Sequence, residues 1–269
     1  MKIKFYAPEW GNTLPFETFC QHIKAVGYDG IEMALPLDSK EKQEILDILE
    51  KYKLELIGQY WQSFEKDIDE HAKNYEKYLR HLISAKQIFV NCQTGKDYFN
   101  FEQNKRLFDV AKNISMDTGV KIIHETHRGK SLFAANITEE YLTKIPDLRI
   151  CLDISHWCTV HESLLEDQQE AVDLAIAHTD HIHSRVGHSE GPQVNDPRVP
   201  EWSGVLETHL AWWDKVVKTH QKNGTDLTIT TEFGPAPYMN AMPFTQMPVA
   251  NQFEINVFMM NLLKQRYQK

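Results

Sequence analysis

The sequence predicts an α/β protein that folds as a (β/α)8 TIM barrel, with residues 1–269 forming a single domain. Three observations predict this fold. Short apolar runs alternate with longer stretches of 3.6-residue periodicity, and this pair recurs eight times along the chain. A chain of 269 residues has the usual length of one such barrel, and no linker or change of composition divides it. An open doubly wound sheet is disfavoured because neither a G-x-G-x-x-G nor a Walker sequence is present.

Strands and helices are expected in strict alternation. The strand candidates are residues 3–7, 29–34, 54–60, 87–92, 120–125, 149–153, 180–184 and 227–232. The helix candidates are residues 16–26, 39–51, 67–85, 102–118, 137–145, 162–178, 204–222 and 250–266. Gly27 is expected to end the first helix, because glycine readily adopts the left-handed conformation of helix C-termini.

Two connecting segments are too long and too rich in Gly and Pro for simple turns. They are residues 185–202 and 233–250, and each follows the end of a predicted strand. The loops that follow the strands build the active-site face of a barrel, and long loops in compact domains are usually functional. We therefore expect these two segments to act as lids.

Composition limits the classes of partner. The chain carries 29 Lys and Arg against 38 Asp and Glu, a formal charge of −9, so the surface should repel nucleic acid. The four cysteines form no C-x-x-C pair and are expected to be reduced. No run approaches the about 18 apolar residues of a membrane span, and Met1 to Trp10 lacks a signal-peptide core. A cytoplasmic protein is expected, provided that the chain is complete, and a homo-oligomer is compatible with the sequence.

The side chains that carry chemistry gather at the ends of the last four predicted strands. Eight of the thirteen histidines fall between His124 and His188. If Ile122, Ile150, Leu152, Ile182 and Ile229 face the helices, strand alternation turns four other side chains into the barrel. These inward side chains are Glu125, Asp153, His183 and Glu232.

Three carboxylates at one barrel mouth would repel each other without a cation, and raised pKa values, a buried base or a bound metal ion could relieve this repulsion. A metal ion is the simplest of the three. A set of two Glu, one Asp and one His suits one divalent metal ion, namely Mn2+, Mg2+ or Co2+, and is acceptable to Zn2+. The alternative for the three acids is ordinary salt bridges with Lys121, Arg149 or Arg185.

The order of these motifs resembles that of the xylose-isomerase-like barrel family, the sugar phosphate isomerases and epimerases that include ketose 3-epimerases, hydroxypyruvate isomerase and inosose dehydratase. The resemblance spans almost the whole chain. It rests on the sequence Gly-Tyr-Asp-Gly-Ile-Glu at residues 27–32, Glu125 in His-Glu-Thr-His, Asp153-x-x-His156, His183 in His-x-His, and Glu232 before Phe-Gly-Pro. It departs from the ketose 3-epimerases at Ser131, where that subgroup has a further Glu.

The resemblance implies a small sugar, sugar phosphate or sugar acid as substrate. In the family, the Glu-Asp-His-Glu set binds one divalent ion and the two glutamates transfer protons, roles that fall here on Glu125 and Glu232. His156 and Arg185 are implied to hold substrate oxygens. Proton abstraction next to a carbonyl leaves an enediolate that a metal ion can stabilise. Return of the proton gives either isomerisation or epimerisation, and a lyase that dehydrates a keto-inositol is the nearest alternative.

Further candidates for substrate contact follow the strand ends. Trp10, Glu32 and Trp61 end the first three strands, and Asn91 and Lys96 follow the fourth. His127 with Arg128 could bind an anionic substrate, and His188 in the first long loop could reach substrate. His124 has the outward parity of a packed histidine, whereas His181 lies one layer below His183 and could orient it.

Two other functions remain open at this point. The DNA-repair endonuclease relative of the fold binds three zinc ions with more histidines than this chain offers. Its strand-three and strand-four histidines correspond to Gln59 or Tyr60 and to Asn91 or Gln93, and its later Asp-x-His corresponds to residues 196–198, Asp-Pro-Arg. The second of these functions is that of a barrel that binds a sugar without catalysing a reaction.

Overall fold

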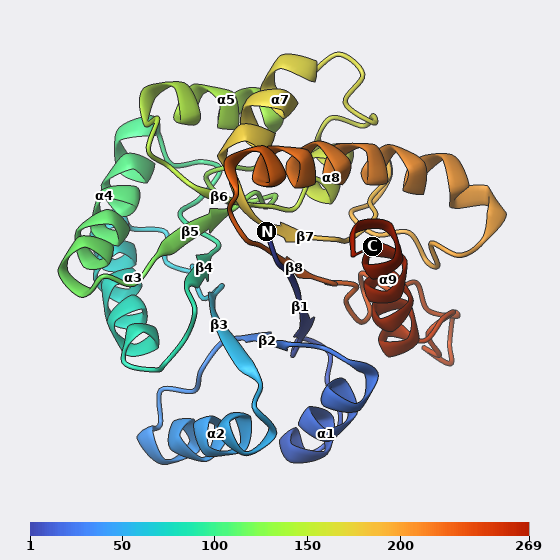
Figure 1. Ribbon diagram of the computed structural model, residues 1–269. Helices are drawn as coiled ribbons and strands as arrows, with labels where there is room; N and C mark the ends of the chain where they lie inside the picture. The colour runs from blue at the N-terminus through green and yellow to red at the C-terminus, as the bar shows by residue number, and fades with distance from the viewer. Residues whose placement is uncertain (269) are drawn as a thin grey trace.

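The chain folds into a closed barrel of eight parallel strands in sequence order, with β1 paired to β8, as the computed structural model of residues 1–268 shows. Figure 1 looks along the barrel, with the helices surrounding the strands. The strands are β1 (Ile3–Pro8), β2 (Gly30–Met33), β3 (Glu55–Tyr60), β4 (Val90–Cys92), β5 (Ile122–Glu125), β6 (Ile150–Leu152), β7 (Thr179–His183) and β8 (Leu227–Thr230). The predicted (β/α)8 class is confirmed.

The helices cover the outside of the barrel. They are α1 (Phe16–Val26), α2 (Ser39–Tyr52), α3 (Ile68–Ile83), α4 (Phe101–Thr118), α5 (Ala135–Lys144), α6 (Ser155–Val160), α7 (Gln169–His178), α8 (Ser203–Asn223) and α9 (Gln252–Tyr267). Gly27 ends α1 with a φ of 98°, a left-handed value that suits glycine. None of the helices described for residues 1–268 combines the length and the apolar composition that a membrane-spanning helix requires.

One helix prediction is wrong in its extent. The helix expected over residues 162–178 begins only at Gln169, and the short helix α6 precedes it. Glu162 and Leu165 have φ values of 49° and 60°, which no right-handed helix contains. The segment between α6 and α7 is therefore a series of turns.

The side-chain alternation of the strands divides the apolar residues into two cores. Ile122, Ile150, Leu152, Ile182 and Ile229 belong to the large core that includes side chains of the surrounding helices. A small core inside the barrel consists of Tyr6, Ile57, Phe89, Ile123 and Cys151. This arrangement confirms the predicted parity, so the residues in phase with Ile123 and Cys151 face the barrel axis.

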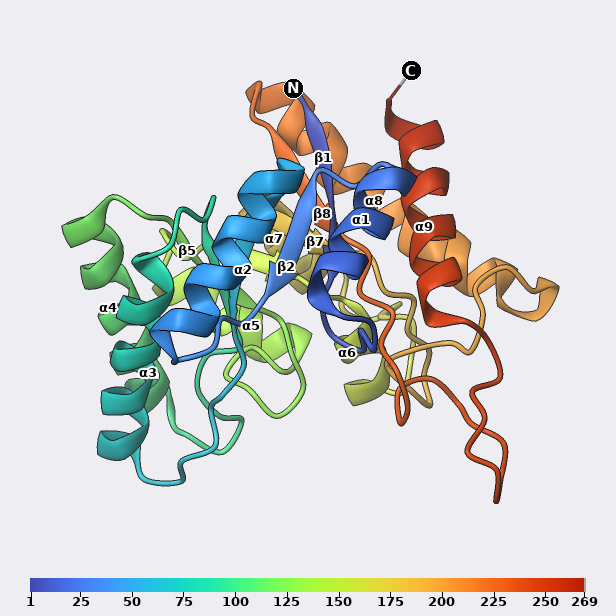
Figure 2. The same ribbon diagram turned by 90° about the horizontal axis from the view of Figure 1, so that it is seen from below.

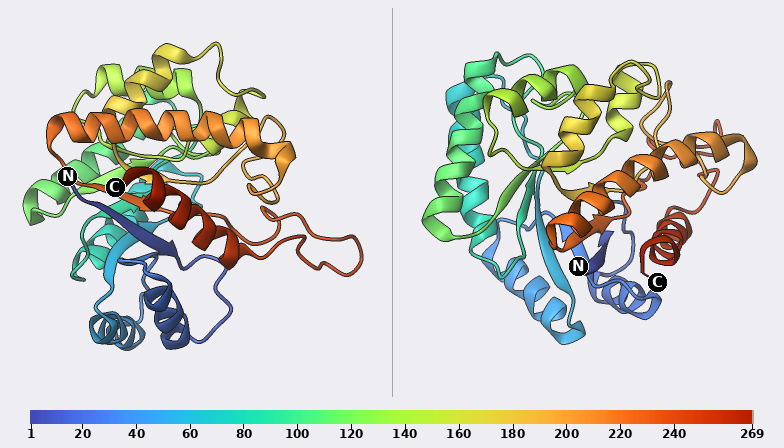
Figure 3. Two further views of the ribbon diagram at one scale, coloured as in Figure 1. Left: turned by 45° about the vertical axis from the view of Figure 1, so that its right-hand side comes forward. Right: turned by 45° about the horizontal axis from the view of Figure 1, so that its top comes forward.

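The two long loops lie at the carboxyl end of the barrel. Residues 185–202 contain only an isolated bridge and a short 3-10 turn at Pro200–Trp202. Residues 233–250 extend away from the barrel as a narrow arm between β8 and α9, which Figures 2 and 3 show in profile. Phe244, near the tip of the arm, is fully exposed.

Candidate active site

Three acidic side chains and one histidine meet at the carboxyl end of the barrel. Glu125 ends β5, Asp153 follows β6, His183 ends β7 and Glu232 follows β8 by two residues. One ligand atom from each lies within 4.8 Å of the others. All four side chains are at most 6% exposed, so the group, called the quartet below, lies under the protein surface.

The His183 ring is oriented by Glu32, an acid that is not part of the quartet. Its Nδ1 atom lies 2.9 Å from Glu232 Oε2, 3.7 Å from Glu125 Oε1 and 4.0 Å from Asp153 Oδ2, yet forms no hydrogen bond. Its Nε2 atom lies 3.0 Å from Glu32 Oε2 and donates to that carboxylate. A histidine that binds a metal commonly donates its other ring N–H to a carboxylate in this way.

Glu32 is almost completely buried and receives several donors besides His183. Thr230 Oγ1 donates to Oε2 at 2.5 Å, and Asn91 Nδ2 donates to Oε1 at 2.9 Å. His181 Nε2 lies 3.1 Å from Oε2. Although burial opposes ionisation, His183 and His181 hold the pKa of Glu32 well below its usual range. Glu32 is thus surrounded by other side chains of the protein and lies beneath the quartet.

The side chains of the quartet shift each other's pKa values. Burial raises the pKa of Glu125 to about 8, and the carboxylates of Glu232 and Asp153 add to this effect. Burial alone would lower the pKa of His183, but the surrounding acids raise it well above its usual range. A divalent cation bound among the three acids would favour their ionised forms, so these shifts are compatible with a metal site.

Arg185 is the buried cation next to the quartet. Its Nη2 atom forms an ion pair with Asp153 and lies 3.4 Å from Glu232 Oε2. The same nitrogen donates to His156 Nε2 at 2.8 Å, and Nη1 donates to the Glu232 backbone carbonyl at 3.3 Å. Of the salt bridges considered for the three acids, the one to Arg185 forms, whereas Lys121 and Arg149 both pair with Asp180.

Two other groups of metal-binding side chains overlap the quartet. One consists of Cys151, His181 and His183, and the other of Glu125, His127 and His156. Burial raises the pKa of the Cys151 thiol well above its usual range, which disfavours the thiolate that a metal needs. His156 Nε2 already accepts from Arg185. The quartet is therefore the strongest candidate of the three.

A hollow of about 360 Å3 opens above Glu232 and contains several of the residues singled out from the sequence. Trp10, Trp61, His127 and Arg185 line it. The His156 ring packs against that of His127 with 3.8 Å between ring centroids and a tilt of 44° between the planes. Burial lowers the pKa of His127 to about 3, so its imidazole is neutral near neutral pH.

Some of the predicted substrate contacts have other neighbours. His188 does not line the hollow within the described residues, and its ring packs against Trp202 at 4.9 Å. Glu32 lies beneath the quartet, as described above. His124 has the outward position expected of it, with Nδ1 2.7 Å from Thr94 Oγ1 and its ring edge on Phe108.

The hollow also contains residues that the sequence pattern did not single out as substrate contacts. They are Glu9, Gly11, Ala34, Gln59, Gln93 and Tyr238. Gln59 Nε2 donates to Glu232 Oε1 at 3.2 Å, and Gln93 Nε2 donates to Glu125 Oε1 at 3.4 Å. Because Glu9, Gln59 and Gln93 lie at or just after strand ends, the position rule that identified the quartet would also have found them. Tyr238 comes from the arm, and no local signal marks it.

Comparison with solved structures finds barrels of the same kind. The 3-keto-D-glucoside 4-epimerase from E. coli matches with a TM-score of 0.60 and 14% identity over 98% of this chain and 100% of the other. A probable 3-DHS dehydratase from Bacillus anthracis has a TM-score of 0.59 and 14% identity over 99% and 100%. Endonuclease IV from Thermus thermophilus has a TM-score of 0.57 and 12% identity over 98% and 97%.

These structural neighbours are xylose-isomerase-like TIM barrel enzymes, as the resemblance in the motifs predicts. At such low identity the likeness concerns the fold alone, and the three proteins have different activities. No protein-family model and no curated protein sequence matches the chain. Evidence for function must therefore come from the site itself.

Proposed function

We propose that the chain is a divalent-metal-dependent isomerase or epimerase of a sugar-like substrate. One observation carries the proposal: the buried Nδ1 atom of His183 has no hydrogen-bond partner and faces three buried carboxylates. Burying three carboxylates around one imidazole is costly, and a cation held by the quartet would bind this nitrogen and offset the acids. Glu125, Asp153, His183 and Glu232 would hold the ion, and their oxygen-rich set suits Mn2+, Mg2+, Co2+ or Zn2+.

The residues of the hollow fit a sugar. Trp10, Trp61 and Tyr238 offer aromatic faces, while Gln59 and Gln93 place amides near the two glutamates. Polar groups set among aromatic walls are typical of small-molecule sites that orient a ligand with hydroxyl groups. When bound, the ion would supply positive charge next to the substrate oxygens on which negative charge develops.

The two glutamates are proposed to transfer the proton. Glu232 lines the hollow, and Glu125 lies within the same 4.8 Å cluster but comes from a different part of the barrel wall. One carboxylate removes a proton from the carbon next to the carbonyl, and the other returns a proton to that carbon or its neighbour. Arg185 and His156 are placed to hold a substrate oxygen, because both belong to the same hydrogen-bonded group beside Glu232.

The other two readings receive less support. Asp196, in the segment that corresponds to the endonuclease's later zinc ligands, pairs with Arg198 at 2.7 Å instead of facing the quartet. Where the endonuclease has its strand-three and strand-four histidines, this chain has Gln59, Asn91 and Gln93, and their amides donate to Glu232 and Glu125. A sugar-binding protein without activity would not require two carboxylates that transfer protons.

The test combines metal analysis with isotope exchange. Purified protein is expected to bind one divalent ion, whereas a His183→Ala variant loses it and an Asp196→Asn control keeps it. In D2O, NMR should show deuterium entering a carbon-bound position of a ketose or aldose. Loss of water from the substrate would instead indicate a lyase. Absence of any bound divalent ion at every pH at which the protein is folded would overturn the proposal.

A further inference from the structure

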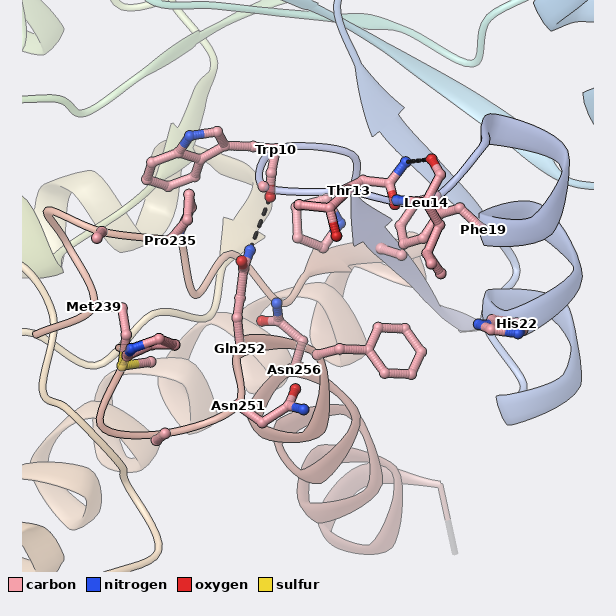
Figure 4. A pocket seen from close by; sticks show the side chains of 18 of the residues that line it. Trp10, Thr13, Leu14, Phe19, His22, Pro235, Met239, Asn251, Gln252 and Asn256 are labelled. Carbon is pink, nitrogen blue, oxygen red and sulfur yellow. Dashed lines mark hydrogen bonds between the residues drawn. The ribbon is translucent and has the colours of Figure 1, made fainter. Parts of the chain in front are cut away.

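A second and larger hollow lies beside the candidate active site. Its volume is about 730 Å3, compared with about 360 Å3 for the hollow above Glu232. Figure 4 shows it between the loop that follows β1 and the first turns of α9, with Leu14 and Phe19 on one side and Pro235 and Met239 on the other. Trp10 and Gly11 line both hollows, so these two residues form a wall common to them.

The shared wall is held rigidly. A Cβ atom at Gly234 would lie 2.1 Å from Cη2 of Trp10, so the indole packs directly on the glycine backbone. Gln252 Nε2 donates to the Trp10 carbonyl at 2.8 Å, the contact drawn in Figure 4. The indole edge meets Tyr238 at 4.9 Å between centroids. A ligand that occupies both hollows would therefore lie across Trp10 and leave its position unchanged.

The lining of the larger hollow indicates an uncharged occupant. Among residues 1–268, no Asp, Glu, Lys or Arg lines it. Leu14, Phe19 and Phe253 supply apolar surface, and the exposed side chains of Thr13 and Gln246 add a hydroxyl and an amide. An apolar wall with a few free polar groups suits a ring that has both C–H faces and hydroxyls.

We propose that the larger hollow is a second subsite, which binds the group attached to the reacting sugar. The substrate is then an uncharged glycoside or disaccharide, larger than a free monosaccharide. This inference rests on the proposed function, since the quartet and Glu232 define where the reacting sugar lies. The common wall carries the argument, because Trp10 and Gly11 line both hollows, so a substituent of the reacting sugar that extends over Trp10 would reach the larger hollow.

The experiment compares fructose with three glucosyl-fructose disaccharides, turanose, maltulose and palatinose, by calorimetric titration of the metal-loaded protein. At least one disaccharide is expected to bind about tenfold more tightly than fructose, a difference of about 1.4 kcal/mol. A Leu14→Arg variant places a long charged side chain in the larger hollow and should bring this affinity ratio close to one. Leu14 is 41% exposed, so the fold should tolerate the change.

The matched control is Leu37→Arg, because Leu37 is 42% exposed and lines neither hollow in the described chain. It should keep the wild-type ratio. The proposal is overturned if no disaccharide binds more tightly than fructose, or if Leu14→Arg weakens fructose and disaccharide equally. Metal binding and deuterium exchange do not depend on the larger hollow. If only the subsite proposal failed, the protein would still bind the metal ion and still exchange deuterium into the substrate.

Discussion

The Nε2 atom of His183 lies 3.0 Å from the carboxylate of Glu32, on the side of the imidazole opposite to the rest of the quartet. The two residues are 151 positions apart in the sequence and both are buried. This contact fixes the ring so that Nδ1, the nitrogen without a hydrogen-bond partner, faces Glu125, Asp153 and Glu232. The availability of that nitrogen for a metal ion therefore depends on Glu32.

Replacing Glu32 by Gln should weaken metal binding by about 10- to 100-fold. The amide nitrogen of Gln would meet donors from Thr230, His181 or Asn91, so the His183 ring would lose its support. Titration of the purified variant with Mn2+ measures the effect. Glu9→Gln, which alters a carboxylate of the hollow without touching His183, serves as control, and unchanged affinity in Glu32→Gln would show that the contact is not needed.

Replacing Glu232 by Gln should lower turnover by about 10^2- to 10^4-fold, because the amide cannot accept a proton from carbon. Binding of a substrate should persist, since Arg185 and the aromatic walls remain. Rates of deuterium exchange in D2O measure the loss. The exposed Glu254 on α9 provides the control variant Glu254→Gln, and a Glu232→Gln rate within a factor of two of wild type would speak against a proton-transfer role.

Replacing Gly234 by Ala should displace the Trp10 indole, because the added methyl would lie 2.1 Å from Cη2. Overpacking of this kind typically costs about 1–3 kcal/mol of stability. Denaturant unfolding and tryptophan fluorescence report the two effects. Gly204→Ala in the first turn of α8, where an added methyl has no neighbour within 4 Å, should leave stability unchanged or slightly higher. Equal stabilities of the two variants would contradict the packing argument.

The stability of the protein should fall between neutral pH and pH 4 partly through His209. Burial lowers the pKa of His209 from 6.5 to about 4, so the folded chain keeps this imidazole neutral while the unfolded chain takes up a proton. The contribution to stability is therefore complete above pH 6.5 and is lost as the pH falls through 4. The total effect is on the order of 3 kcal/mol.

A His209→Gln variant isolates this effect. His209 Nε2 accepts a hydrogen bond from the Gly187 backbone at 3.1 Å, and the Gln amide oxygen can replace that acceptor without titrating. Urea unfolding at pH 7 and at pH 4.5 should show a smaller loss of stability in the variant than in the wild type. Parallel losses in both proteins would assign the acid sensitivity to other groups.

The barrel and the inward direction of the quartet could be predicted from the sequence alone. Strand alternation has a period of two residues, so Ile122 and Ile150 on the outside determine that Glu125 and its counterparts face inward. In a parallel barrel all strand ends meet at one rim, so four strand-end residues are brought near each other without knowledge of any long-range contact. These inferences need only local periodicity and the closure of the barrel.

Only the tertiary structure decided which distant residues support one another. Glu32 appeared from its strand-end position to be a substrate contact, but the structure places it under His183. Tyr238 reaches the hollow from a loop without periodicity, and Trp10 packs on Gly234 from the opposite end of the chain. Such contacts depend on barrel register and on how irregular loops pack, and both arise from interactions summed over the whole fold, which local patterns do not encode.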